Sequence, residues 1–252
     1  MKLRLKKSLK FRNDLMRKEH ESSYKWYLRV FKSWRRSRNP EVIKRGVRAM
    51  YSDIADQTRK RTEADLKKLV QATVDEFEAK TDVDVDSGFV TRVVAMILAG
   101  KLYKNTWTIT KAVNKINKKL QETIDAIITD GKKQGKTDAE IAEDILAVIN
   151  PNDNQYQHTV STESGTLYVP KIGAATDSLM RTTLEHGFQE AIKQLAEELE
   201  KQKETEVWIR WISALAHNTC EVCESRHNQL YRPSDLPLEH PNGQCDFCIE
   251  YY

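Results

Sequence analysis

The chain has 252 residues, of which 31% are charged and 39% are hydrophobic, and its formal net charge is +4. With only 9 glycines and 6 prolines, the composition favours long helices and an interaction-prone protein over a compact enzyme. The longest apolar run, residues 89–100, contains Arg92 and is too short to span a bilayer. We therefore expect no transmembrane helix, and a protein that is soluble or held in an assembly.

The positive charge is concentrated at the N-terminus. Residues 1–50 hold 17 basic and 4 acidic side chains, a net +13, whereas the other 202 residues hold 24 basic and 33 acidic ones, a net −9. The start of the chain is basic but lacks the apolar stretch of a signal peptide before Asn13. These counts predict a basic arm over residues 1–38.

Within this basic arm, aromatic and aliphatic side chains recur at helical spacing between basic ones. The candidate side chains for nucleic-acid or partner binding are Lys25, Trp26, Arg29, Lys32, Trp34, Arg35 and Arg36. Three interpretations stay open. The arm can contact nucleic acid phosphates through its charge and aromatic groups, dock as an amphipathic helix on a partner or on the protein's own body, or lie on a membrane surface.

Residues 39–130 are predicted to form a helical body. Pro40 marks a turn and a helix start, because proline is tolerated only in the first helical turn. A stripe of apolar residues then predicts a helix over residues 41–79. Residues 88–129 have the pattern of two further helices, broken around residues 100–105.

Residues 131–205 are predicted to be a second helical segment. Thr137 and Glu140 have the spacing of a capping box, in which each side chain satisfies a free amide at the helix start. A short helix over residues 139–149 should follow. The polar stretch after it predicts a loop or a small hairpin, and a long helix is expected over residues 174–203.

Residues 206–252 are predicted to be a separate small module. Tryptophans and β-branched residues predict a strand over residues 206–213, and a second strand is expected at residues 228–231. The tail is too small to bury a core of its own. We therefore expect Trp208 and Trp211 to cover it.

All four cysteines lie in the last 33 residues, as the pairs Cys220/Cys223 and Cys245/Cys248, and His240 stands between the pairs. Zinc takes four thiolate or imidazole ligands in a tetrahedron. Cys220, Cys223, His240 and Cys245 would supply three thiolates and one imidazole, whereas the two cysteine pairs alone would supply four thiolates. The other interpretations are free thiols, or two disulfides, which need an oxidising compartment. A zinc ion is the hypothesis that best explains this local use of cysteine.

Together these features predict a mainly α fold: an elongated helical body with a small, zinc-stapled C-terminal α+β module built on a β-hairpin. Residues 220–252 hold two basic and six acidic side chains, and a module that grips DNA should be basic. The basic arm is therefore the candidate DNA-binding surface. We find no set of nucleophile, base and orienting group in the sequence, and so expect no enzyme activity.

The order of several motifs is informative. Thr-Asp-Ala-Glu-Ile-Ala at residues 137–142 follows a glycine-containing loop, Arg-Thr-Thr-Leu-Glu occupies residues 181–185, and a tryptophan-bearing strand spans residues 208–213. Thr-Cys-Glu-Val-Cys at residues 219–223 and Glu-His-Pro-Asn-Gly-Gln-Cys at residues 239–245 complete the series. This order, over about half of the chain, resembles the minor head, or head morphogenesis, proteins of tailed bacteriophages, the family typified by the F protein of phage Mu.

The resemblance implies one structural zinc ion per chain, with the ligands Cys220, Cys223, His240 and Cys245. Members of the family commonly read His-Pro-Asn-Cys-Arg-Cys at this point, and here Gly243 stands at the first of those two cysteine positions. Cys248 is then the spare thiol, or it replaces His240 in an all-thiolate site. For Arg181 and Glu185 we expect an ion pair within or between helices, not a catalytic role.

The resemblance also implies a function. It is that of a low-copy structural protein of the virion, associated with the portal vertex inside the capsid, that assists head assembly and genome packaging or ejection, and that is found in the host cytoplasm during assembly. The implied partners are the portal protein, the major capsid or scaffolding protein and, through the basic arm, non-specific double-stranded DNA, with no membrane.

Two alternatives from other functional classes stay open. The first is a zinc-framed nuclease of the HNH type, because two cysteine pairs bracket a His-Pro-Asn sequence. However, only 21 residues separate Cys223 from Cys245, and His227 has no acidic neighbour in sequence except Glu224, whereas a general base must be positioned as well as present. The second alternative is a zinc-containing, sequence-specific DNA-binding protein.

Overall fold

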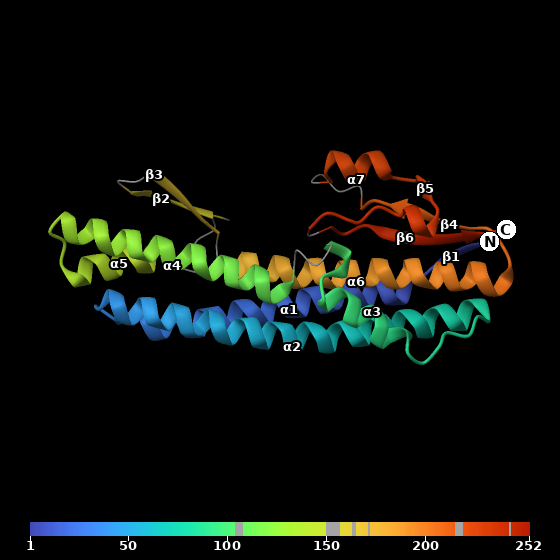
Figure 1. Cartoon of the computed structure of the whole chain (residues 1–252), viewed down its shortest axis with the longest axis horizontal. Helices are drawn as coiled ribbons and strands as arrows, with labels where there is room; N and C mark the ends of the chain where they lie inside the picture. Colours follow the sequence, from blue (N-terminus) through green and yellow to red (C-terminus); the bar gives the residue numbers. More distant parts are fainter. Residues whose placement is uncertain (104–107, 150–156, 163–164, 171, 215–218, 242) are drawn as a thin grey trace. The chain divides into compact units, whose positions relative to one another are not determined.

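The structure, a computed structural model, describes residues 1–103, 108–149, 157–162, 165–170, 172–214, 219–241 and 243–252. Side chains are described for these residues except 19, 20, 22–24, 26, 27, 54, 55, 103, 157–162, 165–170 and 172–177. The chain is mainly helical and has a small antiparallel sheet of four strands (Figure 1). This confirms the predicted fold class, a mainly α protein with a small C-terminal α+β module.

Two compact units divide the chain, and each is built from segments that are far apart in sequence. The sheet unit consists of Met1–Arg17, Arg61–Thr106 and Met180–Tyr252, and the hairpin unit consists of Lys18–Lys60 and Trp107–Leu179. Helices α1 (Lys6–Trp34), α2 (Pro40–Thr81) and α6 (Ile172–Lys203) contribute residues to both units. The first 17 residues of the basic arm are therefore grouped with the C-terminal module, which the linear division into four segments does not anticipate.

The four-stranded sheet joins the two ends of the chain. Its order is β1 (Lys2–Arg4), β6 (Asp246–Tyr251), β4 (Val207–Ile212) and β5 (Leu230–Tyr231), and each neighbouring pair is antiparallel. The sequence predicts β4 and β5 but neither β1 nor β6. The predicted β-hairpin is thus the outer half of a larger sheet, in which the C-terminal strand β6 is central.

The core of the sheet unit lies between this sheet and the helices beneath it. Figure 1 shows the sheet with the C-terminal half of α6 on one side and the short helix α7 (Glu221–Arg226) on the other. Trp211 is fully buried and makes edge-to-face contacts with Phe247 and Tyr231. Trp208 lies half-buried beneath the Arg232 guanidinium. These contacts are consistent with the expectation that both tryptophans cover the C-terminal module.

Helix α1 begins inside the sheet unit, where a side chain from α2 caps it. Glu76 accepts hydrogen bonds from the backbone N–H groups of Lys7 (3.2 Å) and Ser8 (2.7 Å), and from the Ser8 hydroxyl. A helix N-terminus leaves amides unpaired and carries partial positive charge, so a carboxylate is well suited to this position. Leu5, Leu15 and Met16 bury the same stretch in the core.

The hairpin unit contains α4 (Ile109–Lys133), α5 (Asp138–Val148) and the hairpin of β2 (Gln157–Thr162) and β3 (Gly165–Pro170). Both halves of the predicted capping box form at the start of α5, since Thr137 Oγ1 accepts from the Glu140 N–H and Glu140 Oε2 accepts from the Thr137 N–H. The polar stretch that the sequence describes as a loop or small hairpin thus contains a hairpin.

The long helices predicted from apolar stripes are present within a few residues of their expected bounds. Residues 41–79 fall in α2, residues 174–203 fall in α6, and residues 88–129 divide into α3 (Phe89–Leu98) and α4. A 3-10 turn, η1 (Lys101–Tyr103), lies in the expected break. Among the residues that the structure describes, no helix is both long and apolar enough to cross a membrane.

Candidate metal centre

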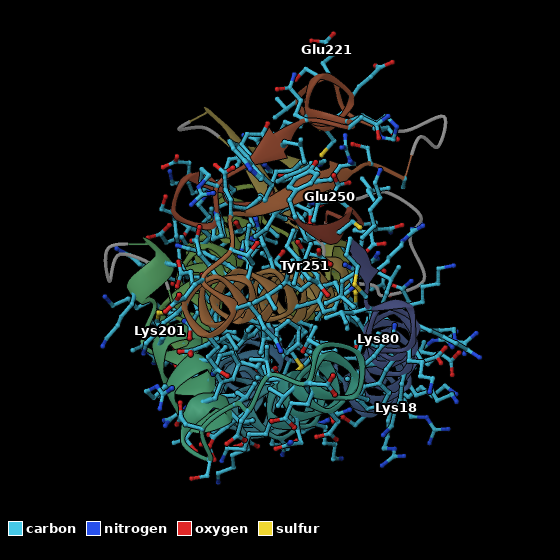
Figure 2. The ribbon with its side chains drawn as sticks, turned by 90° about the vertical axis from the view of Figure 1, so that its right-hand side faces the viewer. Lys18, Lys80, Lys201, Glu221, Glu250 and Tyr251 are labelled. Carbon is cyan, nitrogen blue, oxygen red and sulfur yellow. The ribbon has the colours of Figure 1, made fainter. Side chains whose placement is uncertain are left out.

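The first cysteine pair is placed by helix α7. Cys220 is the N-cap of this helix, and its Sγ accepts a hydrogen bond from the backbone N–H of Cys223 (3.4 Å). An N-cap and the residue three positions later lie on the same side of the first helical turn, so both sulfur atoms face one point. Figure 2 shows Glu221, in the same turn, pointing outward, away from the strand that carries Glu250 and Tyr251.

A second segment, residues 239–245, brings further ligand atoms to this point. The side chains of Cys220, Cys223 and His240 offer ligand atoms that all lie within 4.8 Å of one another, and so do those of Cys223, Glu239 and Cys245. Cys223 is common to both groups. Each group has a composition and spacing that can hold a metal ion.

The predicted ligands Cys220, Cys223, His240 and Cys245 therefore meet in these two overlapping groups. Among the described residues, no four of the ligand atoms lie within 4.8 Å of one another. Glu239 is the member of the site that the sequence analysis misses. Its only sequence signal is its position beside His240, where a single acidic residue is indistinguishable from a solvated one.

Cys248, the alternative fourth thiolate, lies outside both groups. It pairs across the sheet with Arg4 on β1 and Arg210 on β4. Successive side chains of a strand point to opposite faces, so Cys248 is on the face opposite to Phe247 and Ile249, which belong to the core. The all-thiolate site is thus not the arrangement that this fold brings together.

Hydrogen bonding and burial shift the pKa values of the thiols at the site. The pKa of Cys220 is lowered because its sulfur accepts the Cys223 N–H. Burial raises the pKa of Cys223 to about 11, and it raises the pKa of Cys245, where the nearby Glu239 carboxylate acts in the same direction. Both buried thiols are therefore neutral at pH 7 unless a cation stabilises their thiolates. A metal ion would supply that charge.

His240 has the second contact that a metal-binding histidine commonly has. Its Nδ1 lies 2.9 Å from the backbone oxygen of Pro241. A ring N–H at Nδ1 that donates to this oxygen leaves the lone pair on Nε2 for a metal. The tautomer and orientation of the ring thus fit a ligand role.

Two other histidines of the sheet unit have described side chains, and both make hydrogen bonds to backbone atoms near the site. His186 contacts the backbone oxygen of Glu239 through Nε2 (2.8 Å), and burial lowers its pKa, so the neutral ring is favoured. His227 accepts the backbone N–H of Ser213 at Nδ1 (3.1 Å). His217, which precedes the first cysteine pair in the sequence, lies outside the described residues.

A buried ion pair lies next to the candidate metal centre. The Arg12 guanidinium donates to the Cys245 backbone oxygen (2.8 Å) and lies 2.6 Å from Glu185 Oε2, and both side chains are at most 1% exposed. The Arg12 guanidinium also stacks on the Phe188 ring. Burial raises the pKa of Glu185, and the Arg12 charge opposes this rise. The expected ion pair of Glu185 is thus present, with a partner from the basic arm.

The basic side chains proposed for partner binding lie in the hairpin unit, and those of Lys25, Arg29, Lys32, Arg35 and Arg36 are all exposed. Trp34 is half-buried against α2: a Cβ atom at Gly46 would lie only 2.6 Å from its Nε1 atom. The side chain of Trp26 lies outside the described residues. Trp34 therefore packs between two helices, as expected of a helix that docks on the protein's own body.

Comparisons with protein-family models, with curated proteins and with solved structures find no match for this chain.

Proposed function

We propose that this chain is a structural protein whose C-terminal module is held together by one zinc ion, with Cys220, Cys223, His240 and Cys245 as its ligands. The observation that carries the proposal is the pair of overlapping ligand groups that share Cys223. A structural zinc site fills all four positions with protein ligands.

The ion would tie together two segments of the sheet unit that are separate in sequence. Helix α7 carries Cys220 and Cys223, and the segment before β6 carries His240 and Cys245. Because Arg12 binds the Cys245 backbone oxygen, the same centre would also hold the start of α1. A metal that cross-links such segments contributes its binding energy to folding.

The larger role that we propose is that of a minor head protein of a tailed bacteriophage. It would associate with the portal vertex inside the capsid and act in head assembly and genome packaging or ejection without enzyme activity. The motif order over about residues 130–248 supports this proposal. The test is mass spectrometry of purified particles: the chain should co-purify with portal and major capsid proteins at a low, reproducible copy number. Its absence from both procapsids and mature heads would contradict the head role but leave the zinc proposal standing.

The basic side chains at the end of α1 would contact DNA through their charge. Lys25, Arg29 and Lys32 are spaced four and three residues apart and so share one face of the helix, and Arg36 follows in the turn after it. Trp34 packs against Gly46, whereas the exposed basic side chains are available for phosphate contacts. Binding of this kind falls steeply with salt and has little sequence preference.

Fluorescence anisotropy with a duplex of arbitrary sequence tests the DNA contact. Replacing Lys25, Arg29, Lys32 and Arg36 with glutamine should weaken binding and reduce the slope of log K against log salt by about 4, near one unit for each phosphate contact. The matched control replaces Lys115, Lys118, Lys119 and Lys132, exposed lysines of α4, and should leave the slope unchanged. Equal losses in both variants would contradict a specific role of this face.

A nuclease assay distinguishes the structural proposal from the main alternative, a zinc-framed nuclease. The zinc-framed nuclease interpretation predicts metal-dependent cleavage of DNA by the purified full chain, which should be lost in His227→Ala. The structural proposal predicts no cleavage above that of this variant.

A further inference from the structure

Among the described residues, Glu239 is the one acidic side chain that the fold brings into the candidate metal centre. Its carboxylate, Cys223 Sγ and Cys245 Sγ lie within 4.8 Å of one another, and all three residues are buried. By contrast, Cys220 is exposed and His240 is half-buried. The donors therefore divide into a buried side and an exposed side, with Cys223 common to both.

The position of Glu239 is fixed by several contacts. Its backbone N–H donates to Gln189 Oε1 (3.0 Å), and its side-chain Oε1 accepts the backbone N–H of Cys245 (2.9 Å). A side chain held at both ends in this way has its carboxylate oriented before any ligand arrives. Such preorganisation is what a metal site requires of its ligands.

The second carboxylate oxygen lacks a cationic partner. Oε2 of Glu239 has no hydrogen-bond partner among the described residues, and the residue is only 2% exposed. A charged or polar group beside this side chain, the Glu185 carboxyl, is not a cation. Arg12, the buried cation nearby, is paired with Glu185. Burying a carboxylate without a compensating positive charge is costly. A cation at this point would remove that cost.

The chain also keeps space free for this carboxylate. A Cβ atom at Gly243 would lie 2.0 Å from Glu239 Oε1 and 2.1 Å from its Cδ. Any residue other than glycine at position 243 would thus displace the Glu239 side chain. Glycine is needed here because of the close approach of the carboxylate.

We propose that Glu239 is a ligand of the metal centre, so that the ion is bound on the buried side by Cys223, Cys245 and Glu239 and takes its fourth ligand from the exposed side. This inference rests on the proposed metal site but changes its ligand set from three thiolates and one imidazole to one that includes a carboxylate oxygen. Zinc accepts oxygen ligands from glutamate as well as sulfur and nitrogen, so the ion class is unchanged.

The test uses Co²⁺ as a spectroscopic probe, together with competition between the protein and a chromophoric chelator for Zn²⁺. Glu239→Gln keeps an oxygen that can accept the Cys245 N–H but removes the charge. We expect it to bind Zn²⁺ at least about 10-fold more weakly, which is the lower range for loss of a group supporting a metal, and to shift the Co²⁺ ligand-field bands. The control Glu190→Gln, at a buried glutamate of α6 that belongs to neither ligand group, should change neither the Zn²⁺ affinity nor the Co²⁺ spectrum.

The variant His240→Asn then identifies the fourth ligand. If Glu239 is a ligand and Cys220 completes the site, His240→Asn keeps the wild-type affinity and spectrum. A Glu239→Gln variant with wild-type affinity and spectrum would overturn the inference. A wild-type protein that binds neither ion would instead remove the proposed metal site itself.

X-ray absorption at the zinc edge on the wild-type protein gives an answer even if a variant fails to fold. Bound glutamate should appear as a zinc–oxygen distance of about 2.0–2.2 Å beside zinc–sulfur distances of about 2.3 Å. A first shell of three sulfurs and one imidazole, with no oxygen, would contradict the proposal.

Discussion

The two halves of helix α1 are both basic, but among the described side chains only the half in the sheet unit buries a basic one. In the sheet unit, Arg12 is 1% exposed, pairs with Glu185 and binds the Cys245 backbone oxygen. In the hairpin unit, Lys25, Arg29 and Lys32 are exposed. Basic composition is therefore no guide to the role of an individual residue. What distinguishes Arg12 is that other segments provide buried acceptors for its charge.

We expect loss of the metal centre to destabilise the sheet unit and to leave the hairpin unit unaffected. Cys223→Ser removes the ligand common to both groups, and we expect metal affinity to fall about 100-fold or more. Amide exchange in residues 207–252 should become much faster. The helical circular dichroism should persist, because most apolar stripes lie upstream. Loss of the whole helical signal would contradict a two-part protein.

Cys248→Ser is the matched control for this prediction. Cys248 is buried in β6 but belongs to neither ligand group. It should therefore retain the wild-type metal content and exchange pattern near α7.

The buried half of α1 should be the next most sensitive part. Arg12→Ala leaves Glu185 buried without its cation, and breaking such a pair typically costs about 3–5 kcal/mol. Urea denaturation should register this loss in the free energy of unfolding. Lys10→Ala, at an exposed position of the same helix, should change it by less than about 0.5 kcal/mol. Equal effects of the two variants would refute the distinction.

The cap at the start of α1 predicts a pH-dependent effect. Although burial acts to raise the pKa of Glu76, hydrogen bonds from Lys80 and Ser8 outweigh it, and the pKa is lowered from 4.5. The folded pKa thus lies below the unfolded one, so the stabilisation is complete above about pH 5 and is lost as the pH falls through the folded value.

Glu76→Gln should accordingly be less stable than the wild type by about 1–3 kcal/mol at pH 7, and the difference should shrink towards pH 3. Denaturant midpoints measured across this range test the sign. Asp56→Asn, which removes an exposed i,i+4 pair with Lys60 on the same helix, should cost about 0.3–0.5 kcal/mol. A Glu76→Gln difference that grows as the pH falls would show that the assigned pKa direction is wrong.

The exposed half of α1 should show the smallest effect on stability. Replacing Lys25, Arg29, Lys32 and Arg36 with glutamine should change the free energy of unfolding by no more than about 0.5 kcal/mol for each site, because these side chains lie at the surface. Thermal denaturation measures this. A large destabilisation would mean that the basic face serves the fold itself.

Local sequence signals predicted the helices and part of the sheet. The apolar stripes located α2, α4 and α6, and the spacing of Thr137 and Glu140 located the start of α5. Strand β4 was recognisable from its tryptophans and β-branched residues, and in the structure Val207, Ile209 and Trp211 alternate with less buried residues. These signals are contained within a few consecutive residues, which is why they can be interpreted without the rest of the chain.

Features that depend on distant segments were missed. Strand β1 is three residues long and is defined by its pairing with β6, nearly 250 positions away. Polar and apolar residues alternate over Asp246–Tyr251, which is a strand pattern. The sequence analysis interpreted Cys245 and Cys248 only as candidate metal ligands and so did not predict this strand. Arg12 and Glu239 acquire their roles only where chain segments meet, so neither is distinguishable in sequence from a solvated charge.

The metal content of the purified chain tests the central claim most directly. Native mass spectrometry, with elemental analysis of the same sample, should find one zinc ion per wild-type chain and none in Cys223→Ser. A metal-free wild-type protein that still shows a folded C-terminal module by amide exchange would contradict the account.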